Sequence, residues 1–211
     1  ATKAYRIEAN VKREAAKASA VANLSVIDGS VGGKTEGTAD DVAAVKSQID
    51  AAIAKGITDF IVVNQLARDY DPHEAETVVG QAIHDLASDE SSPNYGTISI
   101  TIADATELSN GAFFECYALK SVTFNQPVAI RGWVFRNCTA LTGVDWANVA
   151  SIGAAAFGGC TFTSPITINQ GTELLSEAFE DCTITGTLTI GEGVTVDAAA
   201  FHDAIVSDCD L

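Results

Sequence analysis

A phenylalanine recurs every 22 residues through the C-terminal half of this chain, with no insertion or deletion between copies. A fixed period of this length is the signature of a solenoid, because each unit cannot bury its own apolar side and does so by stacking on its neighbours. The sequence therefore predicts a stack of similar coils with an internal column of aromatic rings. The phenylalanines are Phe113, Phe135, Phe157, Phe179 and Phe201.

Other apolar positions keep the same period. Two apolar residues with a polar residue between them follow each of the first four phenylalanines, which is the alternation of a half-buried strand. Each coil is therefore expected to add a short strand to one parallel sheet, in an array that begins near residue 97. The apolar pairs are Val122 and Phe124, Val144 and Trp146, Ile166 and Ile168, and Leu188 and Ile190, and a later apolar position holds Ile130, Ile152, Leu174 and Val196.

Four of the five cysteines share one repeat position, three residues after the phenylalanine. A small apolar side chain is expected there, and reduced cysteine is among the most buried residue types. Neighbouring coils would bring these Cα atoms to about 5 Å, which is also within reach of a disulfide. We expect a ladder of free, buried thiols, with partial disulfide pairing as the alternative. The four are Cys116, Cys138, Cys160 and Cys182, whereas Cys209 lies outside the repeat position.

The frame that contains these positions runs from Leu108 to Phe124 and again from Ile130 to Trp146. It reads [Ile/Leu/Val]-x-x-x-[Ala/Val]-Phe-x-x-Cys-x-x-Leu-x-x-Val-x-[aromatic/Ile] and resembles the BspA-like branch of the leucine-rich repeats over about residues 97–206. The resemblance implies an α/β leucine-rich-repeat solenoid. It also implies a bacterial protein that is secreted or attached to the cell surface and adheres to host matrix proteins or to other cells.

The segment before the repeats predicts a helix–strand–helix cap for the stack. Thr38 and Asp41 form a capping pair in front of an amphipathic helix that ends at Gly56, and Phe60–Val63 is a β-branched and aromatic run typical of a buried strand. The sequence from Asp71 through Pro72 predicts the start of a second helix. We therefore divide the chain into an N-terminal arm and linker (1–37), helical capping units (38–96) and five repeats (97–211). The pattern of residues 4–23 leaves strand and helix both open.

The net charge of −16 argues against nucleic acid or an anionic membrane as partner, since either needs a clustered basic surface. Acidity of this kind keeps a protein soluble and is typical of a monomer. No apolar run is long enough to span a bilayer. The chain begins at Ala1 and contains no Met, so we expect its targeting segment to lie outside this sequence.

The sequence offers few groups for catalysis. Its three histidines, His73, His84 and His202, have no Gly-x-Ser-x-Gly nucleophile motif to serve. Asp69, Asp71, His73 and Glu74 form the one cluster with metal-ligand chemistry, although helix capping already explains Asp71 and Glu74. We expect no enzyme activity, cofactor or metal, and keep a site near Asp69–His73 as the least favoured alternative.

The outward side of the predicted repeat sheet is the candidate binding surface. A nearly pure threonine row is explained first by strand propensity, and its functional alternative is a flat surface that docks a partner. Trp133 is the one large aromatic at its repeat position, and it is either an exposed binding anchor or packed against the next coil. The main hypothesis is a protein-binding adhesion scaffold, and the alternative is a glycan-binding accessory module. The candidate residues are Thr101, Thr123, Asp145, Thr167, Thr189, Asn125, Asn169 and Trp133.

Overall fold

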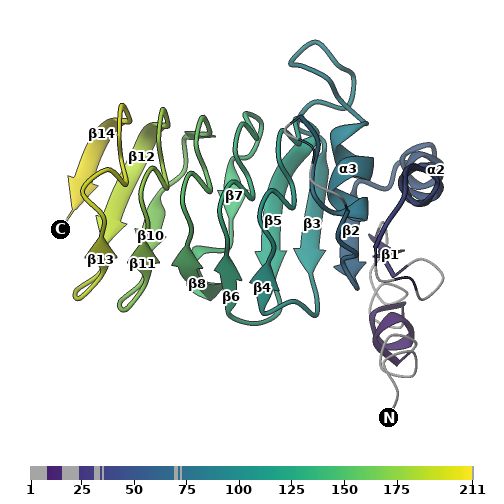
Figure 1. The fold of residues 1–211 in the computed structure, drawn as a ribbon. Helices are drawn as coiled ribbons and strands as arrows, with labels where there is room; N and C mark the ends of the chain where they lie inside the picture. Colours follow the sequence, from purple (N-terminus) through teal and green to yellow (C-terminus); the bar gives the residue numbers. More distant parts are fainter. Residues whose placement is uncertain are drawn as a thin grey trace.

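The computed structural model describes residues 9–15, 24–30, 34, 36–68, 71 and 73–210. Coils lie side by side in one row, with the helices at the N-terminal end and strand β14 at the other end (Figure 1). This arrangement confirms the predicted leucine-rich-repeat solenoid. Within the N-terminal stretch, residues 9–15 are helical, and the remainder of residues 4–23 lies outside the described residues.

The first sheet is entirely parallel and joins the capping segment to the repeats. Its register follows the 22-residue period, so that Ile100 pairs with Val122 and Val122 with Val144. Strand β1 was not predicted, because its short run falls in the stretch interpreted as an arm. The strands, in spatial order, are β1 (Leu24–Asp28), β2 (Asp59–Val63), β3 (Ile98–Ile102), β5 (Leu119–Phe124) and β7 (Gly143–Val144).

The expectation of one continuous repeat sheet is wrong, because the sheet is interrupted after β7. The next residues form a 3-10 turn, η2 (Trp146–Asn148). The Asp145 carboxylate accepts hydrogen bonds from Asn148 Nδ2 at 2.8 Å and from the Phe124 backbone N–H at 3.4 Å. Asp is unfavourable in strands and readily bonds to nearby backbone, so it turns the chain where the other coils continue as strands.

The later coils form a separate parallel sheet. Strand β14 is its edge, and Ile205 at the start of that strand is 64% exposed. The sheet holds β10 (Ile166–Ile168), β12 (Thr183–Ile190) and β14 (Ile205–Asp210), and β9 (Thr161–Phe162) pairs with β12.

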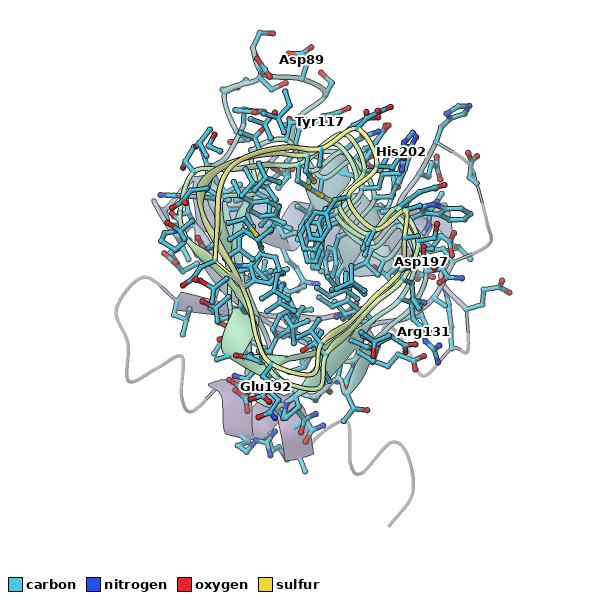
Figure 2. The ribbon with its side chains drawn as sticks, turned by 90° about the vertical axis from the view of Figure 1, so that its left-hand side faces the viewer. Asp89, Tyr117, Arg131, Glu192, Asp197 and His202 are labelled. Carbon is cyan, nitrogen blue, oxygen red and sulfur yellow. The ribbon has the colours of Figure 1, made fainter. Side chains whose placement is uncertain are left out.

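A third parallel sheet runs along another side of the stack. Each of its strands ends on the later apolar repeat position noted above, as Leu108 and Ile130 illustrate. The strands are β4 (Glu107–Leu108), β6 (Val128–Ile130), β8 (Val149–Ile152), β11 (Glu173–Leu174) and β13 (Thr195–Val196). The coil is therefore closed on several sides around its apolar interior, which Figure 2 shows in a view along the stack.

The predicted aromatic column is confirmed. Neighbouring rings from Phe113 to Phe201 stack with centroids 5.1–5.7 Å apart and planes within 16° of parallel. The first four phenylalanines are fully buried, whereas Phe201 is partly buried. Trp146 and Phe162 pack edge-on or tilted against Phe157 at 5.2 and 5.8 Å and fill the interior where the first sheet stops.

The four in-phase cysteines are free and buried, so the structure selects the thiol ladder over partial disulfides. Each thiol donates to a backbone carbonyl in the preceding part of the stack, as from Cys138 Sγ to the Phe113 oxygen at 3.0 Å. Burial raises the pKa of Cys182 to about 12 and raises the pKa of Cys116 and Cys160 well above the usual value. All four thiols therefore satisfy backbone carbonyls, and Cys116, Cys160 and Cys182 are poor nucleophiles because burial disfavours their thiolates.

The predicted first helix is confirmed as α2 (Ala39–Ile53). Thr38 and Asp41 form the predicted capping box at its start. Its apolar side, which includes Val45 and Ile49, is buried in the common core.

The predicted start of the second helix near Asp71 is wrong: α3 spans Val78–His84 and is capped by Thr77. The described residues before it turn and bend, and the Glu74 N–H donates to the Asp71 carbonyl. The loop is closed because the Arg68 N–H donates to the Glu76 carbonyl and the Glu76 N–H donates to the Gly111 carbonyl. A helix can therefore begin only after these bonds end. Pro72 and Asp69 lie outside the described residues.

Helix α3 lies directly on the first repeat. A side chain at Gly80 would place its Cβ 1.8 Å from the Ala112 carbonyl oxygen, so only glycine fits this contact. The Thr77 hydroxyl donates to the same carbonyl at 2.8 Å, and Cys116 Sγ donates to the Gly80 carbonyl at 3.3 Å. The capping segment and the repeats therefore share one core.

Replacement of a central column phenylalanine tests this packing. Phe157→Ala is expected to lower the free energy of unfolding by about 3–5 kcal/mol, because it removes a fully buried ring and leaves a cavity. Phe201→Ala should cost less, because that ring is only partly buried. Urea denaturation followed by circular dichroism measures both. Equal stability of Phe157→Ala and the unsubstituted chain would contradict the stacked core.

The thiol ladder predicts the reactivity of the cysteines. In the native chain at about pH 8, DTNB should modify Cys209 quickly and leave the four ladder thiols unmodified, because these are buried out of reach of the reagent. All five should react in denaturant. Fast modification of more than one thiol in the native chain would show that the ladder is accessible.

Candidate binding site

The threonine row is split by the break in the sheet. Thr101 and Thr123 remain together on the first sheet, where their hydroxyls are 2.8 Å apart, and Ser121 donates to Ser99 at the same distance. These four hydroxyls line a shallow pocket of about 240 Å³ that Asp59 borders. Part of the predicted surface is therefore an ordered patch of hydroxyls.

The other residues of that prediction do not join this patch. Thr167 and Thr189 pair with each other on the later sheet. The Asp145 carboxylate accepts the hydrogen bonds of the turn described above, and Asn169 Nδ2 donates to the Trp146 carbonyl at 2.7 Å. Both side chains therefore stabilise the coil itself. Asn125 is exposed beyond the end of β5.

Trp133 lies on a different side of the coil, the turn face, which we define as the surface over residues 111–115, 133–137, 155–159 and 177–181. Its side chain is 45% exposed, so the structure selects the exposed alternative. The sequence analysis grouped Trp133 with the residues of the sheet. The turn residues have no strand pattern of their own that would have placed them on another side of the coil.

The backbone of Trp133 is in the left-handed region, with φ of 58°. Gly111, Ala155 and Glu177 have φ values of 57°, 52° and 61° at the same repeat position, so the coil itself imposes this conformation. A bulky residue is rarely tolerated there, at a cost of roughly 1–2 kcal/mol. Because Ala155 and Glu177 share this conformation, it belongs to the repeat, and what distinguishes Trp133 is a large exposed aromatic side chain at that position.

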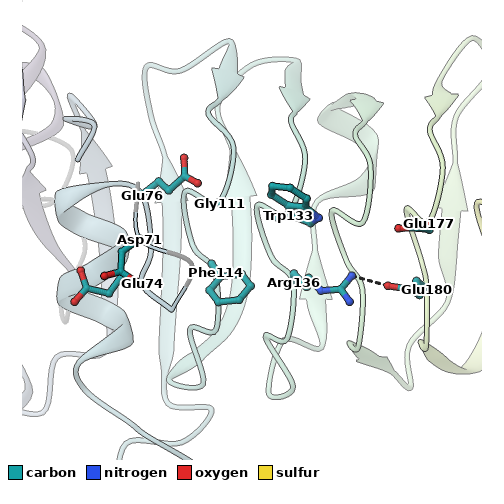
Figure 3. A pocket seen from close by; sticks show the side chains of 9 residues that line it. All are labelled: Asp71, Glu74, Glu76, Gly111, Phe114, Trp133, Arg136, Glu177 and Glu180. Atoms are coloured by element: carbon teal, nitrogen blue, oxygen red, sulfur yellow. Dashed lines mark hydrogen bonds and ion pairs between the residues drawn. The ribbon is translucent and has the colours of Figure 1, made fainter. Parts of the chain in front are cut away.

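Two pockets adjoin the Trp133 side chain, since its neighbours in the column, Gly111 and Ala155, are small. The larger has a volume of about 350 Å³ and combines aromatic and acidic residues (Figure 3). The second has a volume of about 270 Å³ and includes Leu175, which is 42% exposed. The larger pocket is lined by Asp71, Glu74, Glu76, Gly111, Phe114, Trp133, Arg136, Glu177 and Glu180. The second is lined by Asn110, Arg131, Gly132, Trp133, Gly153, Ala154 and Leu175.

An ion pair joins two residues that line the larger pocket. Arg136 donates to Glu180 at 2.6 Å although the two residues are 44 positions, or two coils, apart. The coil between them carries Gly158, where a Cβ would lie 2.7 Å from the Arg136 guanidinium. Because Gly158 has no side chain, the Arg136 side chain can pass over this coil and reach Glu180.

The pocket remains acidic after its ion pairs are counted. Glu74 pairs with Arg68 at 2.6 Å and Glu180 with Arg136. Among the described residues, no ion pair involves Asp71, Glu76 or Glu177. Partial burial raises the pKa of Glu76, which is the expected effect of desolvation on a carboxyl without a nearby cation.

The described residues contain no group of three or more His, Cys, Asp or Glu side chains suited to a metal ion. His73 is exposed, and its backbone N–H donates to the Asp71 carboxylate, while Glu74 is paired with Arg68. His84 lies 3.2 Å from Asp85, and His202 lies 3.5 Å from Asp203. Asp69 lies outside the described residues, so the alternative site near Asp69–His73 is described only in part.

The stacked coils, parallel sheets and exposed turn face define a leucine-rich repeat solenoid, a fold that is typically non-catalytic and serves as a protein-binding scaffold. The chain belongs to the family described as BspA type Leucine rich repeat region, whose profile matches residues 91–206 in six copies. Proteins of this family are typically extracellular or surface-associated. Comparison with curated proteins and with solved structures gave no match. Within the described part of the chain, no helix has the length and apolar character needed to cross a membrane.

Replacement of Trp133 by glycine separates binding from stability. Relief of the left-handed strain opposes the loss of the half-buried ring, so Trp133→Gly should change the free energy of unfolding by less than about 1 kcal/mol. Urea denaturation beside Phe157→Ala measures this difference. A loss as large as that of Phe157→Ala would make Trp133 a structural residue.

Proposed function

We propose that this chain is a non-catalytic adhesion scaffold of a secreted or surface-attached bacterial protein, and that it docks a protein partner on the turn face around Trp133. The observation that carries the proposal is an exposed tryptophan, held at a left-handed backbone position, between two pockets. Tryptophan is among the residues most enriched at the energetic centres of protein interfaces.

The composition of the turn face favours a protein partner. Trp133 and Leu175 offer apolar area, and the carboxylates of the larger pocket border it on the Trp133 side. An apolar centre with a polar rim is the usual anatomy of a protein–protein interface. A tryptophan side chain has only two torsions, so Trp133 offers a large contact area at a low cost in conformational entropy when a partner binds.

A second candidate function rests on the first sheet. The pocket lined by Ser99, Thr101, Ser121 and Thr123 presents an array of hydroxyls with Asp59 at its border. Such an array suits the hydroxyl groups of a glycan, so this face supports the glycan-binding alternative. Its hydroxyls bond to each other in pairs, and a ligand would have to share or replace these bonds.

Binding panels with matched variants test both candidates. The purified chain is applied at physiological salt to purified matrix proteins and to glycans, beside a turn-face variant, Trp133→Gly with Leu175→Ser, and a sheet variant, Thr123→Lys with Thr167→Lys. We expect a protein ligand whose affinity falls at least about tenfold in the turn-face variant, because hot-spot aromatics contribute about 2 kcal/mol or more. The sheet variant should keep that affinity.

Other outcomes reassign the function. A glycan ligand that is lost only in the sheet variant would establish the second candidate. A protein ligand kept in the turn-face variant would contradict the proposal for Trp133. Metal that remains bound to the purified chain after dialysis would favour the alternative site near Asp69–His73.

A further inference from the structure

The larger pocket specifies the charge of its occupant. We infer that it receives a basic side chain, arginine in particular, from the protein partner, beside an apolar side chain of the same segment in the Leu175 pocket. The inference rests on the proposed function and adds the chemical class of the partner segment.

The geometry of the larger pocket suits a guanidinium group. Trp133 and Phe114 supply aromatic surface, and Arg is the cation that most often stacks on aromatic rings. A pocket of about 350 Å³ has room for one long side chain. The aromatic rings lie between two groups of carboxylates: Glu76 comes from the segment before α3, and Glu177 comes from the second coil after that of Trp133 (Figure 3).

The charges select a cation over an anion. Five carboxylates and one guanidinium line the pocket. Arg136 is the cation, and Glu180 already neutralises it at 2.6 Å. An anionic ligand would therefore meet Asp71, Glu76 and Glu177 without an available positive partner, whereas a guanidinium on the aromatic rings would find a carboxylate for a charge-assisted contact on either side of them. The desolvated carboxyl of Glu76 gains most from such a contact.

The second pocket extends the recognition to an adjacent residue. Trp133 lines both pockets, so a segment that crosses this ring places one side chain on each side of it. The Leu175 pocket offers Gly132, Gly153 and Ala154 as small neighbours, and its one cation, Arg131, is paired with Glu107 at 2.7 Å. That pocket therefore suits an apolar side chain.

Short synthetic peptides test this inference on the full chain. The probe is a Gly/Ser peptide with one arginine and one leucine, compared with the same peptide carrying citrulline, which keeps the shape of arginine without its charge, or glutamate. The chain contains two tryptophans, so its NMR spectrum has two indole N–H signals, one from Trp133 and one from Trp146. Trp146 is packed against Phe157 and Phe162 and serves as an internal reference.

The arginine peptide should shift the Trp133 indole signal in a saturable way and leave Trp146 unchanged. The citrulline peptide should bind at least about fivefold more weakly, and the glutamate peptide should not bind, because attraction becomes repulsion. Glu76→Gln with Glu177→Gln should weaken the arginine peptide by about fivefold. Glu192→Gln is the matched control: it removes an exposed carboxylate at another corner of the coil and should leave the affinity unchanged (Figure 2).

Three results would overturn the inference. Equal affinity for the arginine and citrulline peptides would show a binding face without charge selection and would leave the proposed function intact. Arginine binding that survives Glu76→Gln with Glu177→Gln would place the cation elsewhere. No shift of Trp133 with any peptide would remove the basic segment as the ligand, and the protein panel then decides separately whether the turn face binds a partner.

Discussion

The structure depends on the stacking of each coil's apolar side on the next coil. No coil of 22 residues can bury its phenylalanine alone, whereas the stack covers both faces of Phe135, Phe157 and Phe179. Stacking also requires that polar backbone groups inside the coil be satisfied, and the cysteine thiols do so through bonds such as that from Cys160 to the Phe135 carbonyl. Stacking also explains the fixed 22-residue spacing of the repeats, because one inserted residue would move the phenylalanine out of the column.

The same stacking leaves the turn face free to vary. The backbone at Trp133 is set by the coil, since equivalent positions share its left-handed conformation whether they carry Gly, Ala or Glu. A side chain there can therefore change without a change in the stack. Small neighbours at Gly111 and Ala155 open space beside the ring, and Gly158 lets Arg136 reach Glu180 across a whole coil. The binding chemistry that we propose comes from these departures from the repeat.

The sequence predicted what periodicity determines. The phenylalanine column, the buried thiols and helix α2 with its capping box were predicted because each depends on residues close in sequence or in repeat phase. The start of α3 was mispredicted because Glu74 and Glu76 are held by Arg68 and Gly111, contacts that no local capping pattern reveals. The end of the first sheet at Asp145 was indicated by the sequence, since an Asp stands there in a row of Thr residues. We interpreted this Asp as a surface residue of a continuous sheet.

The candidate site was predicted only in part. Trp133 was identified as the one large aromatic residue at its repeat position, but the side of the coil on which it lies was not predicted. The larger pocket gathers Glu76, Phe114 and Glu177 from distant parts of the chain, so only the folded stack brings them together. Phe114, Arg136 and Gly158 hold the same repeat position but differ widely in size and charge. A search for such variable turn positions would have found the residues at the centre of the larger pocket.

The central claim is that the stack holds the fold while the turn around Trp133 binds the partner. Hydrogen–deuterium exchange of the chain, alone and with the protein ligand found in the binding panel, tests it most directly. The account predicts slower exchange on binding in residues 131–137 and no change in strands β3 and β5. Slower exchange in β3 and β5, with residues 131–137 unchanged, would contradict it.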